Sequence, residues 1–390
     1  MNVPPLVVRT RSHPNGVRTT CLRFEDCDIA VSSQDESDLI WLAAFLDCGF
    51  EAVECLSSDY HVELRIDPTG YDRVNDGGRI GEMREGFAKD SNPALFERWH
   101  SNGVGRIFRY NNHPMFFVIS SDGCRVEILA RERSNRCRTA LMRVVRELAM
   151  DRIVATGGTL VHGSAVRTES GVMVMCGPKR SGKTTLLMSV LMNTDAHYLS
   201  NDRCALRAEG DSATVRGIPT LVSIRKDTLD FFPAIRQRLA SVRPDLMDPV
   251  AIGGKKRSKF SVSPPEFHRI LGGCESASSG QLSALVFPQV TNNSAALTVR
   301  RLQPPEVLAR FHRGLFRASK PTVLGEVFGS TGEPKDRLSL RAHASRMEQW
   351  VSQYVPCFDC QLGGGLPPGK QECHALLTAV TEQADRIGVS

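Results

Sequence analysis

Short apolar runs separated by polar turns make up the first third of the chain. Runs with the composition or alternation of β-strands cover residues 19–31, 60–68, 105–110, 113–121 and 125–132. One stretch, residues 35–50 (DESDLIWLAAFLDCGF), instead repeats apolar positions at helical spacing. Residues 69–93 are polar and rich in Gly and Asp, which predicts a long surface loop. This part of the chain is therefore expected to be α+β, and it contains no catalytic motif.

A longer helix is predicted to follow, from Asn135 to about Ile153. Its apolar residues recur at helical spacing, and Gly157 and Gly158 mark its end. We place a domain boundary at the start of this helix. The prediction is an N-terminal α+β domain over residues 1–133 and a second domain over residues 134–390.

Strand and helix patterns alternate in the second domain. A short strand carries His162 in TLVHGSAV, the apolar strand VMVMC ends at Cys176, and KTTLLMSVLMN has helical periodicity. Further strands are predicted near 197–210, 283–290 and 295–302, and helices at 343–354 and 372–387. The expected fold class is α/β, with a mixed sheet flanked by helices and the α+β domain added at the N-terminus.

Composition agrees with a folded protein of ordinary type. Of the 390 residues, 41% are apolar and 24% are charged, and 49 Lys and Arg exceed 43 Asp and Glu by six. The start of the chain lacks the pattern of a secretory signal, and no apolar run is long enough to cross a membrane. We therefore expect a cytoplasmic protein without a membrane partner, whose 12 cysteines are reduced.

Two of these cysteines, Cys357 and Cys360, have the spacing of a redox or metal site. Cys373 and His374 lie downstream and would be the further ligands. The surrounding YVPCFDCQL, however, alternates like a strand, which puts the two cysteines on opposite faces. The alternation favours an ordinary strand over a metal site.

The clearest chemical motif is the loop CGPKRSGKTT, which fits G-x-x-x-x-G-K-[ST] between a strand and a helix. Backbone amides and the helix N-terminus can surround a phosphate, Lys183 can reach the outer phosphates, and Thr184 can ligate Mg²⁺. ATP and Mg²⁺ are the expected cofactors. The alternative is a Gly-rich turn that only joins strand to helix. The nucleotide-binding residues predicted by this motif are Gly177, Pro178, Lys179, Arg180, Ser181, Gly182, Lys183, Thr184 and Thr185.

Phosphoryl transfer also needs an acid to hold metal and a group to take a proton. Asp202 follows the strand HYLS, and we expect this strand to end beside the loop, where Asp202 would bind Mg²⁺ together with Thr184. Asn201 and Asp202 could equally form a simple turn. His162 is expected at the end of a strand beside the loop, facing either the phosphates or the core.

The order of these segments resembles the HPr kinase/phosphorylase-like P-loop family, relatives of phosphoenolpyruvate carboxykinase. The resemblance rests on VHGSAV, GPKRSGKTT and LSND, with IPTLVSIRKDTL and KKRSKFSVSPPEF downstream, and covers about residues 135–310. It implies phosphate and metal roles for Lys183 and Thr184, an active-site role for His162, and for Asp202 the place of the family's second, metal-binding aspartate.

The chain departs from this family at one important position. Where the family has two adjacent aspartates, this chain has Asn201 and then Asp202, and an amide cannot act as a base at neutral pH. Asp202 or His162 would then accept the proton, or the transition state needs no strong base. The family's E-L-R-G-L-G sequence is also missing, which favours a specialised relative over the bacterial regulator itself.

Two basic features offer further positive charge. Lys255, Lys256, Arg257 and Lys259 lie in a Gly-led segment that could close over phosphates or could be a solvated charge run. Arg225 alternates with Val222 and Ile224 and could clamp a phosphate or form a surface ion pair. Among these residues, Lys256 and Arg225 join Asp202, His162 and Lys183 as the predicted catalytic set.

The function expected from these features is an ATP- and Mg²⁺-dependent kinase that phosphorylates a hydroxyl of a peptide, a protein or a small metabolite. The alternative is a nucleotide-binding sensor or scaffold in which Asn201 marks lost catalysis. A nucleic-acid-binding role has only the net charge of +6 in its favour, so nucleic acid is not an expected partner. The sequence leaves the oligomeric state open, a homo-oligomer included.

Overall fold

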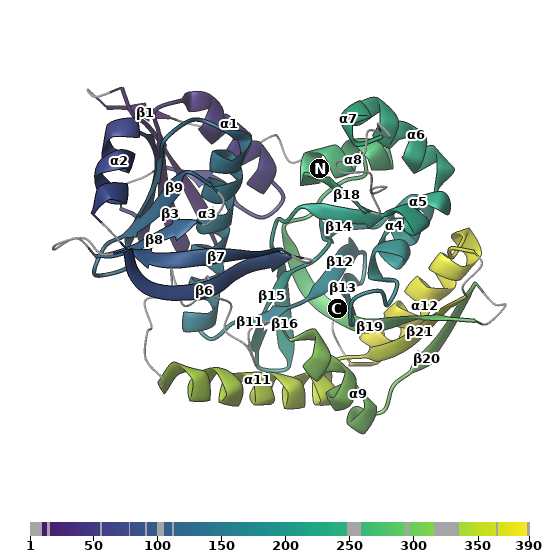
Figure 1. Cartoon of the computed structure of the whole chain (residues 1–390). Helices are drawn as coiled ribbons and strands as arrows, with labels where there is room; N and C mark the ends of the chain where they lie inside the picture. The colour runs from purple at the N-terminus through teal and green to yellow at the C-terminus, as the bar shows by residue number, and fades with distance from the viewer. Residues whose placement is uncertain are drawn as a thin grey trace. The chain divides into compact units, whose positions relative to one another are not determined.

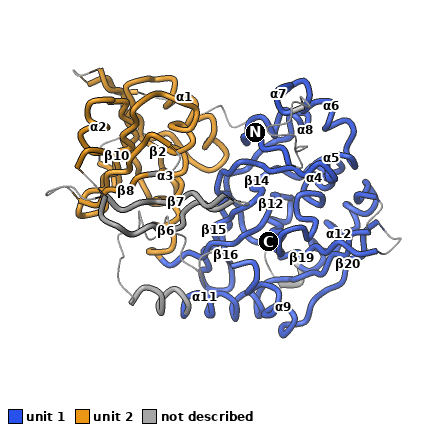
Figure 2. Tube along the Cα trace, viewed as in Figure 1, with its two compact units in different colours: residues 1–3, 157–316, 341–390 blue, residues 4–156, 317–340 orange. Residues whose placement is uncertain are grey.

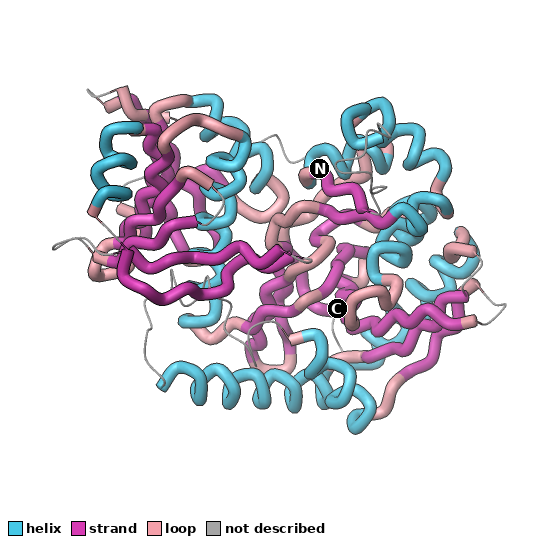
Figure 3. The backbone as a smooth tube through the Cα atoms, viewed as in Figure 1, coloured by secondary structure: helices cyan, strands magenta, loops and turns pink. Residues whose placement is uncertain are grey.

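The protein has a mixed α/β architecture in which mixed sheets are flanked by helices (Figures 1 and 3). The structure is a computed structural model. It describes residues 10–13, 16–54, 57–77, 79–89, 92–99, 105–110, 113–247, 259–292, 296–315, 335–363 and 366–387. The mixed sheets and flanking helices agree with the α/β class predicted from the sequence.

The chain divides into two compact units (Figure 2). Unit 1 comprises residues 1–3, 157–316 and 341–390, and unit 2 comprises residues 4–156 and 317–340. The division falls after helix α3 (Asn135–Ala155), whereas the sequence placed a boundary before it. α3 belongs to unit 2 because its long apolar face packs on strands β3, β5 and β10 of that unit.

Unit 2 is built around a ten-stranded sheet with the order β1-β2-β3-β5-β10-β9-β8-β7-β6, with β4 paired to β2. Helices α1 and α3 pack on the sheet and on each other. The helices are α1 (Glu36–Leu46), α2 (Pro68–Asp76) and α3. The strands are β1 (Arg11–Ser12), β2 (Arg18–Phe24), β3 (Cys27–Ser33), β4 (Glu51–Val53), β5 (Tyr60–Ile66), β6 (Arg79–Lys89), β7 (Asn92–Trp99), β8 (Arg106–Tyr110), β9 (Met115–Ile119) and β10 (Arg125–Ala130).

The predicted loop over residues 69–93 is wrong, because α2 and β6 occupy much of it. α2 begins with Asp67, whose side chain accepts the backbone N–H of Gly70, and Pro68 follows in the first helical turn. Tyr71 then packs with Phe116 in the core (ring centroids 4.9 Å apart). The capping signal and a single aromatic anchor therefore outweigh the polar composition of the segment.

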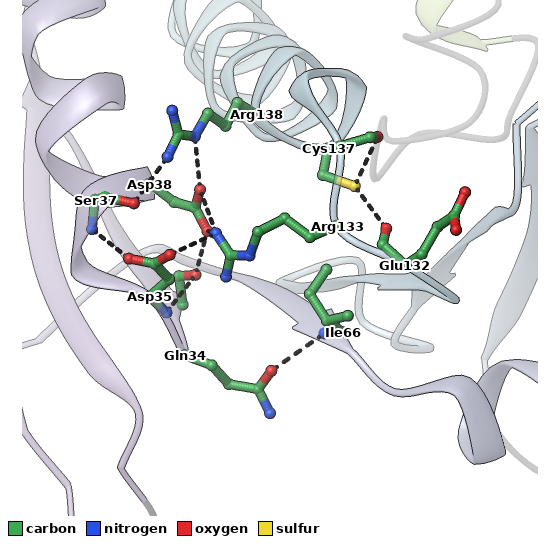
Figure 4. A network of polar contacts seen from close by, with 11 residues as sticks. Gln34, Asp35, Ser37, Asp38, Ile66, Glu132, Arg133, Cys137 and Arg138 are labelled. Atoms are coloured by element: carbon green, nitrogen blue, oxygen red, sulfur yellow. Dashed lines mark hydrogen bonds and ion pairs between the residues drawn. The ribbon is translucent and has the colours of Figure 1, made fainter.

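A buried carboxylate joins α1 to the start of α3 in unit 2 (Figure 4). Asp38 is 1% exposed and accepts hydrogen bonds from Arg133 (2.9 and 3.0 Å), Arg138 (2.8 Å) and the Ser33 hydroxyl (2.8 Å). The two guanidinium groups compensate the cost of removing this charge from water. The network thus holds two helices that are far apart in the sequence.

Unit 1 contains a nine-stranded mixed sheet, a two-stranded sheet and several helices. The helices are α4 (Lys183–Asn193), α5 (Lys226–Asp230), α6 (Pro233–Val242), α7 (Pro244–Met247), α8 (Pro264–Leu271), α9 (Pro304–Phe311), the 3₁₀ helix η2 (His312–Gly314), α11 (Lys335–Tyr354, of which residues 341–354 belong to this unit) and α12 (Lys370–Ile387). The strands are β11 (Thr159–Val161), β12 (Gly163–Thr168), β13 (Gly171–Cys176), β14 (His197–Ser200), β15 (Cys204–Glu209), β16 (Ser212–Gly217), β17 (Val222–Arg225), β18 (Lys259–Val262), β19 (Ser279–Thr291), β20 (Leu297–Arg301) and β21 (Cys357–Gly363).

The order of the large sheet in unit 1 is β11-β15-β16-β19-β13-β12-β14, and β21 joins β19 to β20. β13 runs parallel to β19 and β19 runs parallel to β21, whereas β12 is antiparallel to both β13 and β14. The central strands are buried on both faces, and their apolar side chains pack into one core with α9 and α11. β13 therefore holds the start of the following loop, residues 177–182, on the buried core of the sheet.

Two segments of unit 1 bear on the sequence predictions. The strand predicted to carry His162 is divided, because β11 pairs with β15 while β12 pairs with β13 and β14, and His162 lies between them. The strand predicted for CFDC is confirmed as β21. Cys357 and Cys360 are an odd number of residues apart on it and are both buried, so they lie on opposite faces of the sheet.

Candidate functional site

The candidate site is built on the turn between β13 and α4. A side chain at Gly177 would meet the Ser181 hydroxyl at 2.8 Å, so the loop closes tightly only around glycine. Gly182 is the N-cap of α4 and has a φ of +96°, a conformation that residues with a Cβ rarely adopt. A Cβ there would also lie 2.4 Å from Leu362 Cδ1 of β21. The two motif glycines are thus required by the packing of the loop.

The N-terminus of α4 has no side-chain cap. The free N–H groups of its first turn and the helix dipole make this end electropositive. The Ser181 hydroxyl is buried in the same loop and has no hydrogen-bond partner among the described residues. The loop therefore offers donors suited to an anion such as a phosphate.

Lys183, the first residue of α4, bonds the backbone of the loop that precedes it. Its ammonium donates to the carbonyl oxygens of Gly177 (2.7 Å) and Pro178 (3.0 Å). The residue is 9% exposed, and burial lowers the pKa of the ammonium. A buried cation that bonds neutral carbonyl oxygens is well placed to exchange one of them for a phosphate oxygen.

Strand register brings His162 and Asp202 to the same edge of the sheet as this loop. Gly163 at the start of β12 is paired with Cys176 at the end of β13, so His162 lies level with the first loop residue. The Gly163 amide also donates to the Asp202 carbonyl (3.1 Å), just after β14 ends. The ends of three neighbouring strands therefore meet here.

The two side chains contact each other at this edge. His162 Nδ1 lies 3.4 Å from Asp202 Oδ1, and Arg203 Nε lies 3.5 Å from Asp202 Oδ2. Burial lowers the pKa of His162, Asp202 opposes this shift, and the positive charges of Lys183 and Arg203 add to it. His162 is therefore neutral at pH 7, with a nitrogen free to accept a proton.

Asn201 precedes Asp202 in the chain, and its side chain is buried. Its carbonyl accepts the Ser164 hydroxyl at 2.6 Å, which fixes the turn against β12. Its side-chain Oδ1 is buried and has no hydrogen-bond partner among the described residues. The turn that the sequence offered as an alternative does exist, and it also carries Asp202 to the site edge.

The structure does not bring Arg225 into this cluster. It ends β17 in the separate two-stranded sheet, and its guanidinium bonds both carboxylate oxygens of Asp227 (3.1 Å each). This contact is the surface ion pair that the sequence left open as an alternative. Lys256 lies outside the described residues, and Lys259 is paired with Arg225 across the two strands.

The remaining residues of the loop motif divide into an exposed group before Ser181 and a half-buried group after Lys183. Pro178, Lys179 and Arg180 are exposed on its outer side, and Arg180 has a positive φ of 69°. Thr184 and Thr185 are half-buried in the first turn of α4. Their hydroxyls lie in the part of the helix where its amide donors are uncapped.

Two features of the site have no signal in the sequence. Arg203 faces Asp202 because Ser200 accepts the Arg203 amide and donates to its carbonyl, which tightens the turn. Gly314 accepts the His162 amide (2.7 Å) from a distant segment that follows α9. Only the folded sheet brings these groups to His162 and Asp202.

The oxygen donors at this edge fit Mg²⁺ better than a transition metal. Among the described residues, no group of three His, Cys, Asp or Glu is arranged to hold a metal ion. Mg²⁺ needs no such cluster, since it commonly binds one or two protein oxygens together with phosphates and water. The half-buried Thr184 hydroxyl and the Asp202 carboxylate are donors of the types that Mg²⁺ binds.

In comparisons with known proteins, no family model matches this chain, and no curated protein matches it. Within the part of the chain that the structure describes, no helix is both long enough and apolar enough to span a membrane.

Proposed function

We propose that the chain is an ATP- and Mg²⁺-dependent kinase of the HPr kinase-like type that phosphorylates a hydroxyl group. One observation carries this proposal: a buried Lys183 at an uncapped helix N-terminus shares one sheet edge with the His162–Asp202 pair. Phosphoryl transfer requires a phosphate cradle, a metal-holding acid and a proton acceptor, and these residues are of the right types.

In this proposal the loop residues 177–185 hold the phosphates, and Lys183 releases a carbonyl oxygen to bind the outer one. Thr184 and Asp202 would hold Mg²⁺, which supplies charge neutralisation on the phosphate oxygens. His162 accepts the hydroxyl proton at Nε2, because Asp202 faces Nδ1 and favours the tautomer that carries its proton there. Arg203 places a positive charge 3.5 Å from the other carboxylate oxygen of Asp202, Oδ2.

The acceptor is a peptide, a protein or a small metabolite with a free hydroxyl. We assign its selection to the N-terminal part of the chain, residues 1–133, most of which lies in unit 2. We assign the P-loop kinase chemistry to unit 1, because α3 and residues 317–340 belong to unit 2. The net charge of +6 is compatible with anionic ligands.

The test is Mg²⁺-dependent conversion of ATP to ADP by the full chain. We expect turnover to increase when a true acceptor is present, and the acceptor to gain about 80 Da by mass spectrometry. Lys183→Met should abolish turnover and weaken ATP binding. Lys226→Met is the matched control, because Lys226 is exposed on α5 and pairs with Asp230. A Lys183→Met protein with full turnover would exclude the proposal.

Asn201 favours a second candidate, a nucleotide-binding sensor that transfers no phosphate. Its buried amide stands where the resembling family has an aspartate, and it cannot accept a proton. An aspartate there would be desolvated, which raises the pKa of its carboxyl toward neutrality and makes it a stronger base. Wild-type protein that binds ATP without transfer, together with an active Asn201→Asp variant, would select the sensor.

A further inference from the structure

Two strands of unit 1 continue past the phosphate loop. Met175 of β13 is paired with Val286 of β19, and β13 ends at the next residue, while β19 continues to Thr291. β21 accompanies β19 to its end, with Thr291 paired to Gly363. At ~3.3 Å per residue, these strands extend about 13 Å beyond β13 and form a wall beside the loop (Figure 1).

One face of this wall is apolar and is directed at the loop. A Cβ at Gly182 would lie 2.4 Å from Leu362 Cδ1 and 3.2 Å from Val290 Cγ2. Val290 is paired with Leu362, and Leu297 of β20 is paired with Leu362 from the other side. Paired residues share a face of the sheet, so these three side chains form one surface, here named the apolar shelf.

The shelf is accessible where it leaves the core. Val290 is 56% exposed, whereas residues 282–288 of the same strand are all buried. The buried Leu362 supports the Gly182 backbone and anchors the shelf to the loop. A ligand held by the loop would therefore lie next to exposed apolar surface on this side.

The shelf and the His162–Asp202 pair lie on opposite sides of β13. β12, which leads from His162, borders one side of β13, and β19 borders the other. A nucleotide bound by its phosphates at the loop has a reacting end and a nucleoside end. With the reacting phosphate toward His162 and Asp202, the nucleoside is directed toward β19 and β21.

We propose that the apolar shelf binds the purine base of the nucleotide through the exposed Val290 and the half-buried Leu297, with the buried Leu362 as their support. The shelf does not distinguish adenine from guanine. None of the three side chains has a nitrogen or oxygen to read the edge of a base. Apolar burial and dispersion act on both purines alike, whereas discrimination requires hydrogen-bonding groups. The proposal rests on the proposed function only in that the loop must bind a nucleotide's phosphates.

The test is calorimetric titration of the full chain with ATP, GTP and inorganic tripolyphosphate, each with Mg²⁺. We expect ATP and GTP to bind within about threefold of each other and tripolyphosphate to bind about tenfold more weakly. Val290→Ser should weaken both nucleotides by about three- to tenfold and leave tripolyphosphate unchanged. Val290→Phe should strengthen both nucleotides. The control is Gln289→Ala, because Gln289 is exposed on the opposite face of the same strand.

The possible failures are distinguishable. If the wild-type chain binds neither tripolyphosphate nor nucleotides, the proposed function itself fails. If it binds all three ligands and Val290→Ser changes none of them, the shelf does not hold the base. Equal weakening of ATP and tripolyphosphate also overturns the proposal, because the substitution then acts through the loop. A preference above about tenfold for one purine contradicts the lack of discrimination.

Discussion

The imidazole Nδ1 of His162 lies 3.4 Å from Oδ1 of Asp202, at the edge of the sheet where the phosphate loop begins. The pair is held by backbone contacts on both sides. Gly314 accepts the amide of His162, and the amide of the next residue, Gly163, donates to the carbonyl of Asp202. These bonds fix the backbone that carries the imidazole and the carboxylate, which suits a proton acceptor in the proposed reaction.

His162→Gln should lower phosphoryl-transfer turnover by about 100-fold, because glutamine cannot accept the proton. Burial, reinforced by the charges of Lys183 and Arg203, holds the pKa of His162 below its ordinary value. Wild-type turnover should therefore stay constant down to about pH 6.5 and decline as the pH falls through the lower pKa of the folded protein. The variant should lack this acidic decline in its pH–rate profile.

The control for this variant is His197→Gln on β14. His197 is partly exposed and lies 3.5 Å from Glu275, outside the cluster of His162, Lys183 and Asp202. It should keep both the turnover and the acidic decline of the wild type. An unchanged pH–rate profile in His162→Gln would exclude the imidazole as the proton acceptor.

Local sequence signals were sufficient for the loop but not for its surroundings. The strand before Gly177 and the helix after Gly182 follow from apolar runs, helical periodicity and the motif spacing. The meeting of His162 with Asp202 depends on how β12 pairs with β13 and β14, and such non-local register is not encoded in the periodicity of any one strand. The contact of Leu362 with Gly182 depends on pairing over a still longer separation.

The errors in the predicted fold have identifiable physical causes. Residues 69–93 were predicted as a loop because of their polar composition. α2 is short and packs only Tyr71 and Val74 on the core, so its apolar signal in the sequence is small. The strand through His162 was predicted as continuous because β11 and β12 are both apolar. They pair with different neighbours, and only the fold shows the change of partner at His162.

Gly182→Ala should destabilise unit 1 for two reasons. A φ of +96° costs an L-residue about 1–2 kcal/mol. The added methyl would also lie 2.4 Å from Leu362 Cδ1, and relieving that clash should cost about 1–3 kcal/mol more. The free energy of unfolding in urea measures the total, and the variant should bind nucleotide less tightly.

Gly210→Ala separates the two causes. Gly210 also has a positive φ, +63°, but a Cβ there meets nothing within 4 Å, so only the backbone cost applies. A double-mutant cycle of Gly182→Ala with Leu362→Ala should show favourable coupling, because the smaller side chain makes room for the methyl. If Gly182→Ala and Gly210→Ala lower the free energy of unfolding by the same amount, the contact with Leu362 is unimportant.

His268 should make the stability of unit 1 depend on pH. It lies on α8 with its ring edge-on to Tyr198 (centroids 5.1 Å apart), and burial lowers its pKa to about 4. The unfolded state, with a pKa of about 6.5, binds the proton first. The contribution of neutral His268 is therefore fully present above pH 6.5 and lost as the pH falls toward 4, by about 3 kcal/mol in total.

The free energy of unfolding, measured between pH 7 and pH 4, checks this expectation. His268→Phe keeps a ring against Tyr198 but cannot be protonated, so its stability should decline less over this range. His374→Gln, at an exposed position of α12, should retain the wild-type decline. A His268→Phe variant with the full wild-type decline would show that other groups are responsible.

Asp38→Asn should destabilise unit 2 more than the loss of an exposed ion pair. The amide keeps the shape of the side chain but leaves Arg133 and Arg138 without their buried counter-charge, at an expected cost of about 2–4 kcal/mol in the free energy of unfolding. The comparison is Asp28→Asn, which removes the negative charge and one of the two acceptors that bond the exposed Arg23 on the same sheet. Water solvates both partners of that pair, so its loss should be much smaller. If the two variants lower the free energy of unfolding by similar amounts, the buried network does not stabilise the packing of α1 against α3 more than an exposed ion pair would.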